Sequence, residues 1–320
     1  MRAYIIRRLL LIIPTLFLVT IIVFFSIRFI PGDVVDLLAT EQTTVGTATA
    51  ESIQENIRMA LGLDTPVHIQ YGRWLGGIFQ GDFGTSLWSN RPITEMIFER
   101  LPVTLELSFL GILVALLISL PIGIYSAIRQ DTAGDYTGRT IAILMISLPS
   151  FWIGTMVVVY PSIWWNWSPP IMYMPFLEHP WENIKQFILP AAIIGMVMSG
   201  ATMRMTRTMM LEVLRQDYIR TAWAKGLSER AIILRHALKN ALIPVITIVG
   251  LQVPILLGGE VIIEQIFGLP GMGRLLLTAL QDRDYPVISA INVMIASAIL
   301  VINLVVDLAY GYLDPRAVYR

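Results

Sequence analysis

Six stretches of about 20 mostly apolar residues recur along the 320-residue chain, and charged residues separate them. A helix needs about 20 apolar residues to cross the hydrocarbon core of a bilayer. Hydrophobic residues make up 55% of the chain and charged residues 14%, more apolar surface than one water-soluble core would bury. The sequence therefore predicts an all-α integral membrane protein with six transmembrane helices. The predicted spans are residues 9–27, 107–128, 140–160, 187–203, 242–261 and 286–306.

The first apolar stretch follows Arg2, Arg7 and Arg8, an arrangement that a cleavable signal peptide also has. Signal peptides have a shorter apolar region, of about 7 to 15 residues, followed by a cleavage site with small residues. The stretch 9–27 is longer, and no small-x-small site follows it. We therefore predict an uncleaved first membrane helix.

The distribution of lysine and arginine indicates on which side of the membrane each connection lies. Of the 23 Lys and Arg residues, about 15 fall in the N-terminus, the second and fourth connections and the C-terminus. Cytoplasmic segments carry the excess of positive charge, so both termini are expected in the cytoplasm. The expected segments are an N-terminal membrane helix over 1–30, an extracytoplasmic region over 31–101, a five-helix core over 102–310 with a cytoplasmic loop at 209–242, and a cytoplasmic tail over 311–320.

Prolines interrupt four of the predicted spans, at Pro14, Pro121, Pro149 and Pro254. A helix in lipid keeps such a break only where neighbouring helices or a cavity satisfy the freed carbonyl groups. The prolines therefore favour a bundle of kinked helices that can move.

The end of the third span is set by aromatic residues, because no charge occurs between residues 140 and 177. Pro161 is followed by Trp164, Trp165 and Trp167, a pattern typical of the aromatic belt at a membrane surface. One span is therefore expected here, followed by a re-entrant or surface loop.

The residue types that carry most enzyme chemistry are absent or scattered. The chain has no cysteine, which excludes disulfides, thiolate metal sites and a cysteine nucleophile. His68, His179 and His236 are far apart in sequence, so no metal site is expected. No Gly-x4-Gly-Lys-Ser/Thr loop, HExxH motif or serine–histidine arrangement occurs. The sequence thus disfavours a membrane-embedded enzyme and predicts that this chain binds no nucleotide.

The basic stretch 209–244 is the most informative part of the chain. Its apolar residues recur at helical spacing up to Gly226, and glycine readily takes the left-handed conformation that ends a helix. Ser228 is a good N-cap for a second helix from Glu229. The tendency of basic residues to stay in the cytoplasm would explain the positive charges of this stretch. It would not explain two helices capped around a glycine. The apolar positions are Leu211, Leu214, Tyr218, Ile219 and Ala222 in the first helix and Ile232, Ile233, Leu234 and Leu238 in the second.

Residues 217–244, DYIRTAWAKGLSERAIILRHALKNALIP, resemble the coupling-loop signature of the permeases of binding-protein-dependent ABC importers. The general pattern of that family has Glu-Ala-Ala, a nearby glycine and a later Leu-Pro. This sequence has Arg220-Thr221-Ala222 at the first positions, keeps Gly226 and ends with Leu238-Lys239-Asn240, departures that resemble the dipeptide and oligopeptide branch. Trp223 stands where that branch usually has a basic or small residue.

The resemblance extends over nearly the whole chain and is to the first-permease (B-type) members of the peptide branch. The segment 161–185 is the least similar part. The matching segments include RFIPGD at 28–33, LGLD at 61–64, GDFGTSL at 81–87, LPSFW at 148–152, FGLPGMG at 267–273, RDYP at 283–286 and residues 307–316.

The resemblance implies a type I ABC importer permease fold in the inner membrane of a bacterial or archaeal cell. It implies that the cytoplasmic loop docks as a coupling helix on an ATPase subunit. The residues expected at this contact are Arg220, Thr221, Ala222, Gly226, Leu227, Ser228, Glu229 and His236.

The implied partners are a second homologous permease, two cytoplasmic ATPase subunits, an extracytoplasmic solute-binding protein and membrane lipid. A heterodimer of permeases is expected, and a homodimer stays open. ATP and magnesium would be held by the ATPase subunits, and this chain would bind no cofactor. The net charge of zero gives no reason to expect a nucleic acid partner.

Peptides are the substrate class that the resemblance implies, while nickel chelates, glutathione and oligosaccharides stay open because relatives on the same scaffold carry them. A secondary transporter or channel is a further alternative, since six kinked spans suit it too. It has no need of the capped basic loop. A passive scaffold has no need of prolines within its spans.

Four carboxylates near or within the spans are candidates for a substrate pathway or gate: Glu106, Glu260, Glu264 and Asp307. Glu260 and Glu264 are four residues apart and are expected to share one helix face. They would attract a peptide ammonium group or cap the glycine-rich loop 268–273, and we favour capping.

Overall fold

The computed structural model describes residues 2–28, 64–170 and 172–313. Apart from one isolated bridge between Thr85 and Pro92, the regular structure in these ranges is helical, which confirms the predicted all-α class. Residues 31–63 of the predicted extracytoplasmic region 31–101 and residues 314–320 of the predicted tail 311–320 lie outside the described residues.

Two compact units make up the chain. Unit 1 contains Met1–Leu10, Arg100–Leu275 and Ala298–Arg320, and unit 2 contains Leu11–Glu99 and Leu276–Ser297. The units cut across the expected segments because four helices supply residues to both. These helices are α1 (Arg2–Arg28), α5 (Ile93–Ile128), α13 (Met272–Gln281) and α14 (Tyr285–Leu313).

Five helices in the described part of the chain are long and apolar enough to cross a membrane, and a bent pair of helices brings the number to six if it forms one span. Five of the predicted spans each correspond to one long helix in the predicted order, and the third corresponds to the bent pair. Most of the helices extend beyond the predicted bounds. The spans are Ile6–Ser26, Ile93–Ile128, the pair Ala133–Ser147 and Ser150–Trp165, Pro180–Leu214, Glu229–Leu256 and Tyr285–Leu308.

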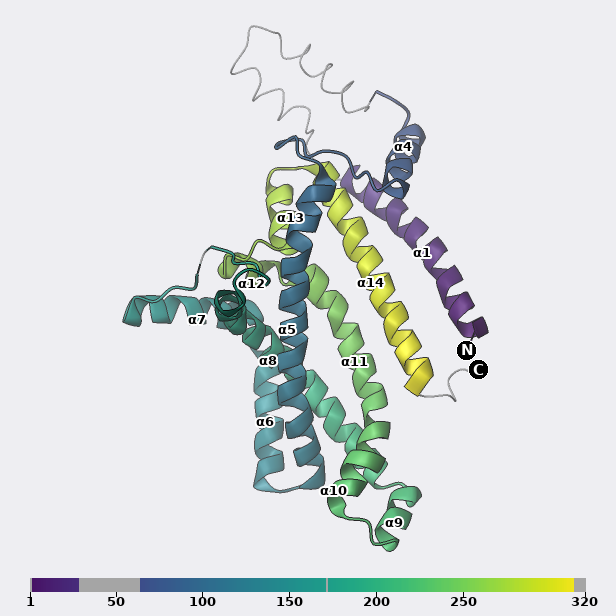
Figure 1. The fold of residues 1–320 in the computed structure, drawn as a ribbon, viewed down its shortest axis with the longest axis vertical. Helices are drawn as coiled ribbons and strands as arrows, with labels where there is room; N and C mark the ends of the chain where they lie inside the picture. The colour runs from purple at the N-terminus through teal and green to yellow at the C-terminus, as the bar shows by residue number, and fades with distance from the viewer. Residues whose placement is uncertain (1, 29–63, 171, 314–320) are drawn as a thin grey trace. The chain divides into compact units, whose positions relative to one another are not determined.

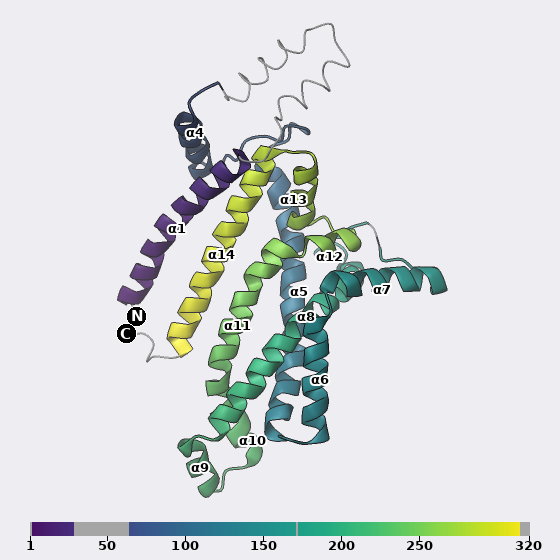
Figure 2. The ribbon, with the colours of Figure 1, turned by 180° about the vertical axis from the view of Figure 1, so that it is seen from behind.

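The third span differs from the prediction of one helix over 140–160. Helix α6 (Ala133–Ser147) and helix α7 (Ser150–Trp165) meet at an angle of 88°. Leu148 precedes Pro149 and is extended, with φ −93° and ψ 123°, because the proline ring disfavours the helical conformation in the residue before it. Both ribbon views show α7 extending away from α6 (Figure 1 and Figure 2).

The third span also ends later than the predicted residue 160. Helix α7 continues through Pro161 and stops at Asn166, which has the left-handed φ of 51°. Tyr160 and Trp164 stack at 4.9 Å between ring centroids, so part of the predicted aromatic belt lies on the last turns of the helix.

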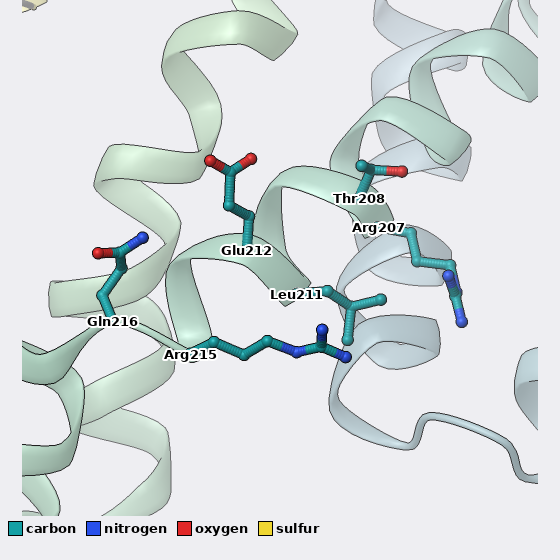
Figure 3. Close-up of a pocket in the computed structure, with 6 residues that line it drawn as sticks. All are labelled: Arg207, Thr208, Leu211, Glu212, Arg215 and Gln216. Carbon is teal, nitrogen blue, oxygen red and sulfur yellow. The ribbon is translucent and has the colours of Figure 1, made fainter.

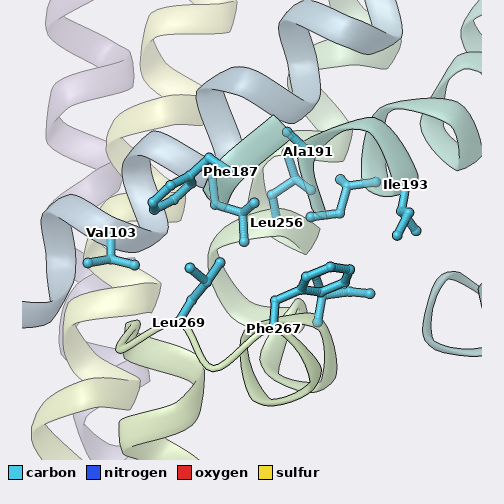
Figure 4. Close-up of a cluster of buried hydrophobic side chains, with 10 residues drawn as sticks. Val103, Phe187, Ala191, Ile193, Leu256, Phe267 and Leu269 are labelled. Atoms are coloured by element: carbon cyan, nitrogen blue, oxygen red, sulfur yellow. The ribbon is translucent and has the colours of Figure 1, made fainter. Parts of the chain in front are cut away.

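The long helix α8 (Pro180–Leu214) organises unit 1 by packing against α6, α7 and α11 (Leu238–Gly259). Small residues allow this approach: a Cβ atom on Gly200 would lie 2.6 Å from the carbonyl oxygen of Ala142 in α6. Closer to the N-terminus of α8, a core of buried apolar side chains joins α5, α8, α11 and α12 (Val261–Ile266) (Figure 4). Its members are Val103, Leu107, Phe187, Ala191, Ile193, Ile194, Leu256, Ile263, Phe267 and Leu269.

Unit 2 contains α4 (Val67–Phe79), whose Tyr71 donates or accepts a 2.9 Å hydrogen bond with Thr20 of α1. The turn that follows α4 is attached to the connection before α14. The Ser86 hydroxyl donates to Asp284 at 2.6 Å, and the Trp88 indole donates to the carbonyl of Asp282 at 2.7 Å.

Candidate functional site

The predicted coupling loop forms a short amphipathic helix, α9 (Asp217–Ala224), between α8 and the helical segment that leads into α11. Its inner face is buried, with Ile219 fully inaccessible and Ala222 7% exposed. Ile219 packs with Met210 of α8 and with Ile232 and Ala237, which come after the turn. The Asn240 amide also donates to the Tyr218 hydroxyl at 2.8 Å and connects α9 to α11. Helix α9 is therefore packed firmly against the two spans that flank it.

Gly226 ends α9 as the sequence predicts. Its φ is +74°, the left-handed region that side chains with a Cβ atom disfavour. The Gly226 amide donates to the carbonyl of Trp223 at 2.9 Å, and the Leu227 amide donates to that of Ala222 at 3.4 Å. These two bonds are the pair of a Schellman cap. A Cβ atom at Gly226 would meet nothing within 4 Å, so backbone conformation alone requires glycine here.

The loop departs from the predicted two short helices at both ends. Leu211 and Leu214 belong to the last turns of α8, because the chain breaks at Arg215 before α9 begins. The second helix is not separate: α10 (Glu229–Ala231) runs into a π-helical stretch, η1 (Ile232–Ala237), and then into α11. Ser228 holds the N-cap position, but its side chain makes no capping hydrogen bond.

The predicted contact residues fall into two groups. Ala222 faces the interior and packs α9 against its neighbours. Its expected contact with an ATPase subunit stays a prediction. His236 is half-buried within η1. The other predicted residues are exposed: Arg220, Thr221, Gly226, Leu227, Ser228 and Glu229. Trp223, 49% exposed, and Tyr218, 43% exposed, add aromatic surface beside them.

A buried ion pair near this helix was not predicted from the sequence. Asp135, in the first turn of α6, has no accessible surface, and Arg207 of α8 donates to both of its carboxylate oxygens at 2.8 Å. The Ser126 hydroxyl of α5 and the Asp131 backbone amide donate to the same carboxylate. Arg139 lies 3.5 Å away as a second ion-pair partner. One carboxylate thus joins α5, α6 and α8.

The C-terminal end of α8 also lines a cavity of about 460 Å³ (Figure 3). Arg215 and Gln216 are exposed there and directly precede α9. The cavity therefore lies directly before the start of the amphipathic helix. Its lining residues are Arg207, Thr208, Leu211, Glu212, Arg215 and Gln216.

Glu264 caps the glycine-rich loop, the role we favoured from the sequence. It lies in α12, outside the apolar spans, and is 1% exposed. Its carboxylate accepts from the Thr104 hydroxyl at 2.7 Å and from the Arg274 backbone amide at 2.8 Å. Burial raises the pKa of Glu264, while the hydrogen bonds from Thr104, Arg274 and the Gly273 amide oppose that rise. A Cβ atom at Gly271 would overlap the carboxylate, so the loop closes tightly over it.

The other three candidate carboxylates are in separate places. Glu260 stands at the junction of α11 and α12 as the N-cap residue of α12. Its carbonyl accepts a 2.9 Å hydrogen bond from the Glu264 amide, so the two residues are one helical turn apart. Asp307 forms an ion pair with Arg8 at 2.8 Å, and both side chains are partly exposed. Glu106 accepts a 3.3 Å hydrogen bond from the Asn183 amide of α8.

The surroundings of Glu106 hold the connection between α7 and α8. The Asn183 amide also donates to the carbonyl of Met174 at 2.9 Å, and the Gln186 amide donates to that of Pro170 at 3.1 Å. Burial and then the charge of Glu106 raise the pKa of Tyr173 in this connection. Within the described ranges, no group of three or more His, Cys, Asp or Glu side chains lies close enough to hold a metal ion.

The comparisons with known proteins cover the whole chain. Residues 119–319 match the family described as binding-protein-dependent transport system inner membrane component, and residues 1–108 match its N-terminal family. A putative peptide transport system permease protein of Brucella suis biovar 1 is 39% identical over 319 residues, covering 100% of both chains. The dipeptide transport system permease protein DppB of Alkalihalophilus pseudofirmus is 40% identical over 100% of both chains.

The DppB protein of Escherichia coli K12 is 38% identical, over 99% of this chain and 98% of its own length. These end-to-end matches confirm the resemblance seen in the coupling loop and the spans. The chain therefore belongs to the inner membrane components of binding-protein-dependent transport systems, the permease subunits of ABC importers.

Proposed function

We propose that this chain forms half of the translocation pathway of a peptide importer and pairs with a second, homologous permease. The relatives that match it from end to end at 38 to 40% identity are named peptide or dipeptide transport permeases, which supports peptides as the substrate class. The second permease would be a different, homologous chain, as the resemblance to the peptide branch implies.

The observation that carries the coupling role is the geometry of α9. A short amphipathic helix lies between two membrane-spanning helices, buried along one side by Ile219 and exposed along the other at Thr221 and Trp223. Such a helix-in-groove element docks by its free face, and its packing transmits a rigid-body movement of the partner to the spans. We assign the free face of α9 and the turn at Gly226 to the ATPase contact.

The energy source is external in this proposal. The sequence has no phosphate-binding loop, so ATP and magnesium would be bound by two separate ATPase subunits. A solute-binding protein would deliver the peptide on the opposite side. Basic residues are in excess at the N-terminus and in the α8–α11 connection, which supports a cytoplasmic position for these two segments.

The test is transport by the assembled complex of both permeases and the ATPases in proteoliposomes, with the binding protein added. We expect uptake of a radiolabelled dipeptide or oligopeptide that requires ATP and stops with a non-hydrolysable analogue. Nickel chelates, glutathione and oligosaccharides are assayed in parallel, and uptake of one of these in place of peptides would reject the peptide assignment. ATP-independent uptake by the permeases alone would instead indicate a secondary transporter or channel.

The orientation is tested separately. The natural chain has no cysteine, so a single Ser228→Cys substitution gives one labelling site. A membrane-impermeant maleimide should label it in inside-out vesicles and not in intact cells. Labelling from outside the cell would contradict the coupling role.

A further inference from the structure

We propose that the ion pair between Asp135 and Arg207 positions the α5–α6 hairpin on α8, so that the hairpin moves together with the coupling helix α9. This inference rests on the coupling role proposed above for α9. It adds a connection that the coupling helix alone does not provide, because Asp135 and Arg207 are 72 residues apart in sequence and lie on different helices.

The bidentate geometry of the ion pair restricts how α6 and α8 can move relative to each other. Both guanidinium contacts are 2.8 Å long and reach both carboxylate oxygens, an arrangement that restricts rotation as well as distance. Asp135 is fully buried, and the Arg207 side chain is 16% exposed. The Asp135 carboxylate is therefore shielded from water, and charge-assisted hydrogen bonds are stronger where water is excluded.

The ion pair is also close to the coupling helix α9 and to the turn of the α5–α6 hairpin. Arg207 is two turns before the end of α8 at Leu214, and α9 starts at Asp217. On the other side, Ser126 of α5 and the Asp131 amide in the hairpin turn bind the same carboxylate. A displacement of α9 that pulls the end of α8 is thus transmitted through Asp135 to both helices of the hairpin.

Arg139 gives the cluster a second cation. Its Nε atom lies 3.5 Å from Asp135, and its buried Nε and Nη2 atoms have no hydrogen-bond partner. Loss of Arg207 alone would therefore leave the Asp135 carboxylate with an ion-pair partner. For this reason we expect Arg207→Gln to fold and to assemble with its partner subunits.

Packing contacts offer a different explanation in which the ion pair only stabilises the fold. Helices α6 and α8 also meet at Gly200 and Ala142, so the hairpin would stay on α8 without the pair. The two explanations differ in one measurable quantity. A stabilising role changes the amount of assembled complex, whereas a positioning role changes the number of substrate molecules moved per ATP hydrolysed.

The experiment compares variants of the assembled complex in proteoliposomes and measures peptide uptake and ATP hydrolysis together. In Arg207→Gln we expect uptake per ATP to fall about tenfold, a typical coupling free energy, while hydrolysis continues. Arg207→Lys keeps the charge and should retain most of the ratio. Arg204→Gln removes an exposed arginine one turn away on the same helix and should behave as the natural protein.

A second measurement follows the distance between the hairpin turn and the end of α8 directly. The absence of native cysteines lets spin labels be placed at Gln130→Cys in the hairpin turn and at Glu212→Cys near the end of α8, both exposed positions. We expect their separation to be the same in the nucleotide-free and vanadate-trapped complexes with the natural Arg207. With Arg207→Gln the separation should differ between the two states.

An unchanged uptake-to-ATP ratio in assembled Arg207→Gln overturns the proposal, as does a constant label separation in that variant. If Arg207→Gln fails to assemble, the double variant Asp135→Asn with Arg207→Gln removes the buried charge. Restored assembly with low uptake per ATP then supports the proposal, and restored uptake per ATP overturns it. Failure of the natural complex to transport peptides would instead count against the proposed function.

Discussion

The Ser86 hydroxyl donates a 2.6 Å hydrogen bond to the Asp284 carboxylate across 198 residues of sequence. Both residues are buried, at 3% and 4% exposure, and the Leu87 backbone amide donates to the other carboxylate oxygen at 3.3 Å. This carboxylate attaches the turn after α4 to the start of α14 within unit 2.

Replacing Asp284 by Ala should detach that turn. The Ser86 hydroxyl and the Leu87 amide would lose their acceptor, at a cost of about 1–3 kcal/mol for each buried group left without a partner. We expect a lower thermal midpoint for the purified complex and faster proteolysis within residues 80–92. Asp282→Ala is the matched control, because Trp88 binds the backbone carbonyl of Asp282 and not its side chain. Equal proteolysis of the two variants would contradict the prediction.

Replacing Glu264 by Gln should loosen the glycine-rich loop. One carboxylate oxygen accepts from Thr104 and the other from the Arg274 amide, and a glutamine side chain has only one acceptor for these two donors. We expect a loss of about 1–3 kcal/mol, measured as a lower thermal midpoint. Glu260→Gln, at the neighbouring junction, should keep the natural midpoint. Normal stability in Glu264→Gln would show that the capping bonds contribute little.

Replacing Gly226 by Val should impair the turn after α9. A β-branched residue at a φ of +74° is strained by about 1–2 kcal/mol or more, although no neighbouring atom blocks its side chain. The strain should shift the Schellman cap and lower peptide uptake per ATP hydrolysed in proteoliposomes. Gly226→Asn is the control, since asparagine tolerates this conformation and should retain most of the uptake. Full coupling in the valine variant would mean that the turn is not part of the ATPase contact.

Replacing Gly200 by Ala should force α6 and α8 apart. The added Cβ atom would lie 2.6 Å from the Ala142 carbonyl oxygen, part of a backbone that cannot move aside alone. Overpacking of this kind costs about 1–3 kcal/mol. Gly76→Ala in α4 is the control, because its Cβ atom would meet nothing within 4 Å, and alanine favours a helix. A thermal midpoint that falls equally in both variants would contradict the packing argument.

Hydropathy predicted the helices well because the bilayer requires each spanning helix to have both a minimum length and an apolar composition. It did not predict the 88° break at Leu148, because a window of apolar residues measures how much chain is apolar and not the direction in which it runs. Pro149 marked the position, but a proline allows a mild kink as well as a sharp one.

Local chemistry predicted the end of α9 and missed the start of the next helix. Gly226 is favoured at a left-handed cap whatever surrounds it, so its role could be inferred from the residue alone. Ser228 is a residue type favoured at helix N-caps, yet its side chain makes no capping hydrogen bond. The chain then continues through η1 into α11 instead of forming a separate short helix. Packing of Ile232 and Ala237 against α9 determines the path there.

The pairing of Asp135 with Arg207 was beyond sequence reasoning. Each residue stands near the edge of an apolar stretch, where an arginine ordinarily serves to set orientation and a single aspartate indicates no particular partner. Only the packing of α6 on α8 reveals that they are buried together. An aligned set of relatives in which both positions change together would have been the one sequence signal for this contact.

Helix α8 is 35 residues long without a break, about 52 Å from end to end. It holds the connection before it through Asn183 near its N-terminal end and the start of α9 at its C-terminal end. As a lever pivoting near Asn183, a tilt of about 5° would swing its far end by about 4 Å, comparable to one helical turn. A small rotation at the N-terminal end of α8 would thereby become a much larger displacement where α9 begins.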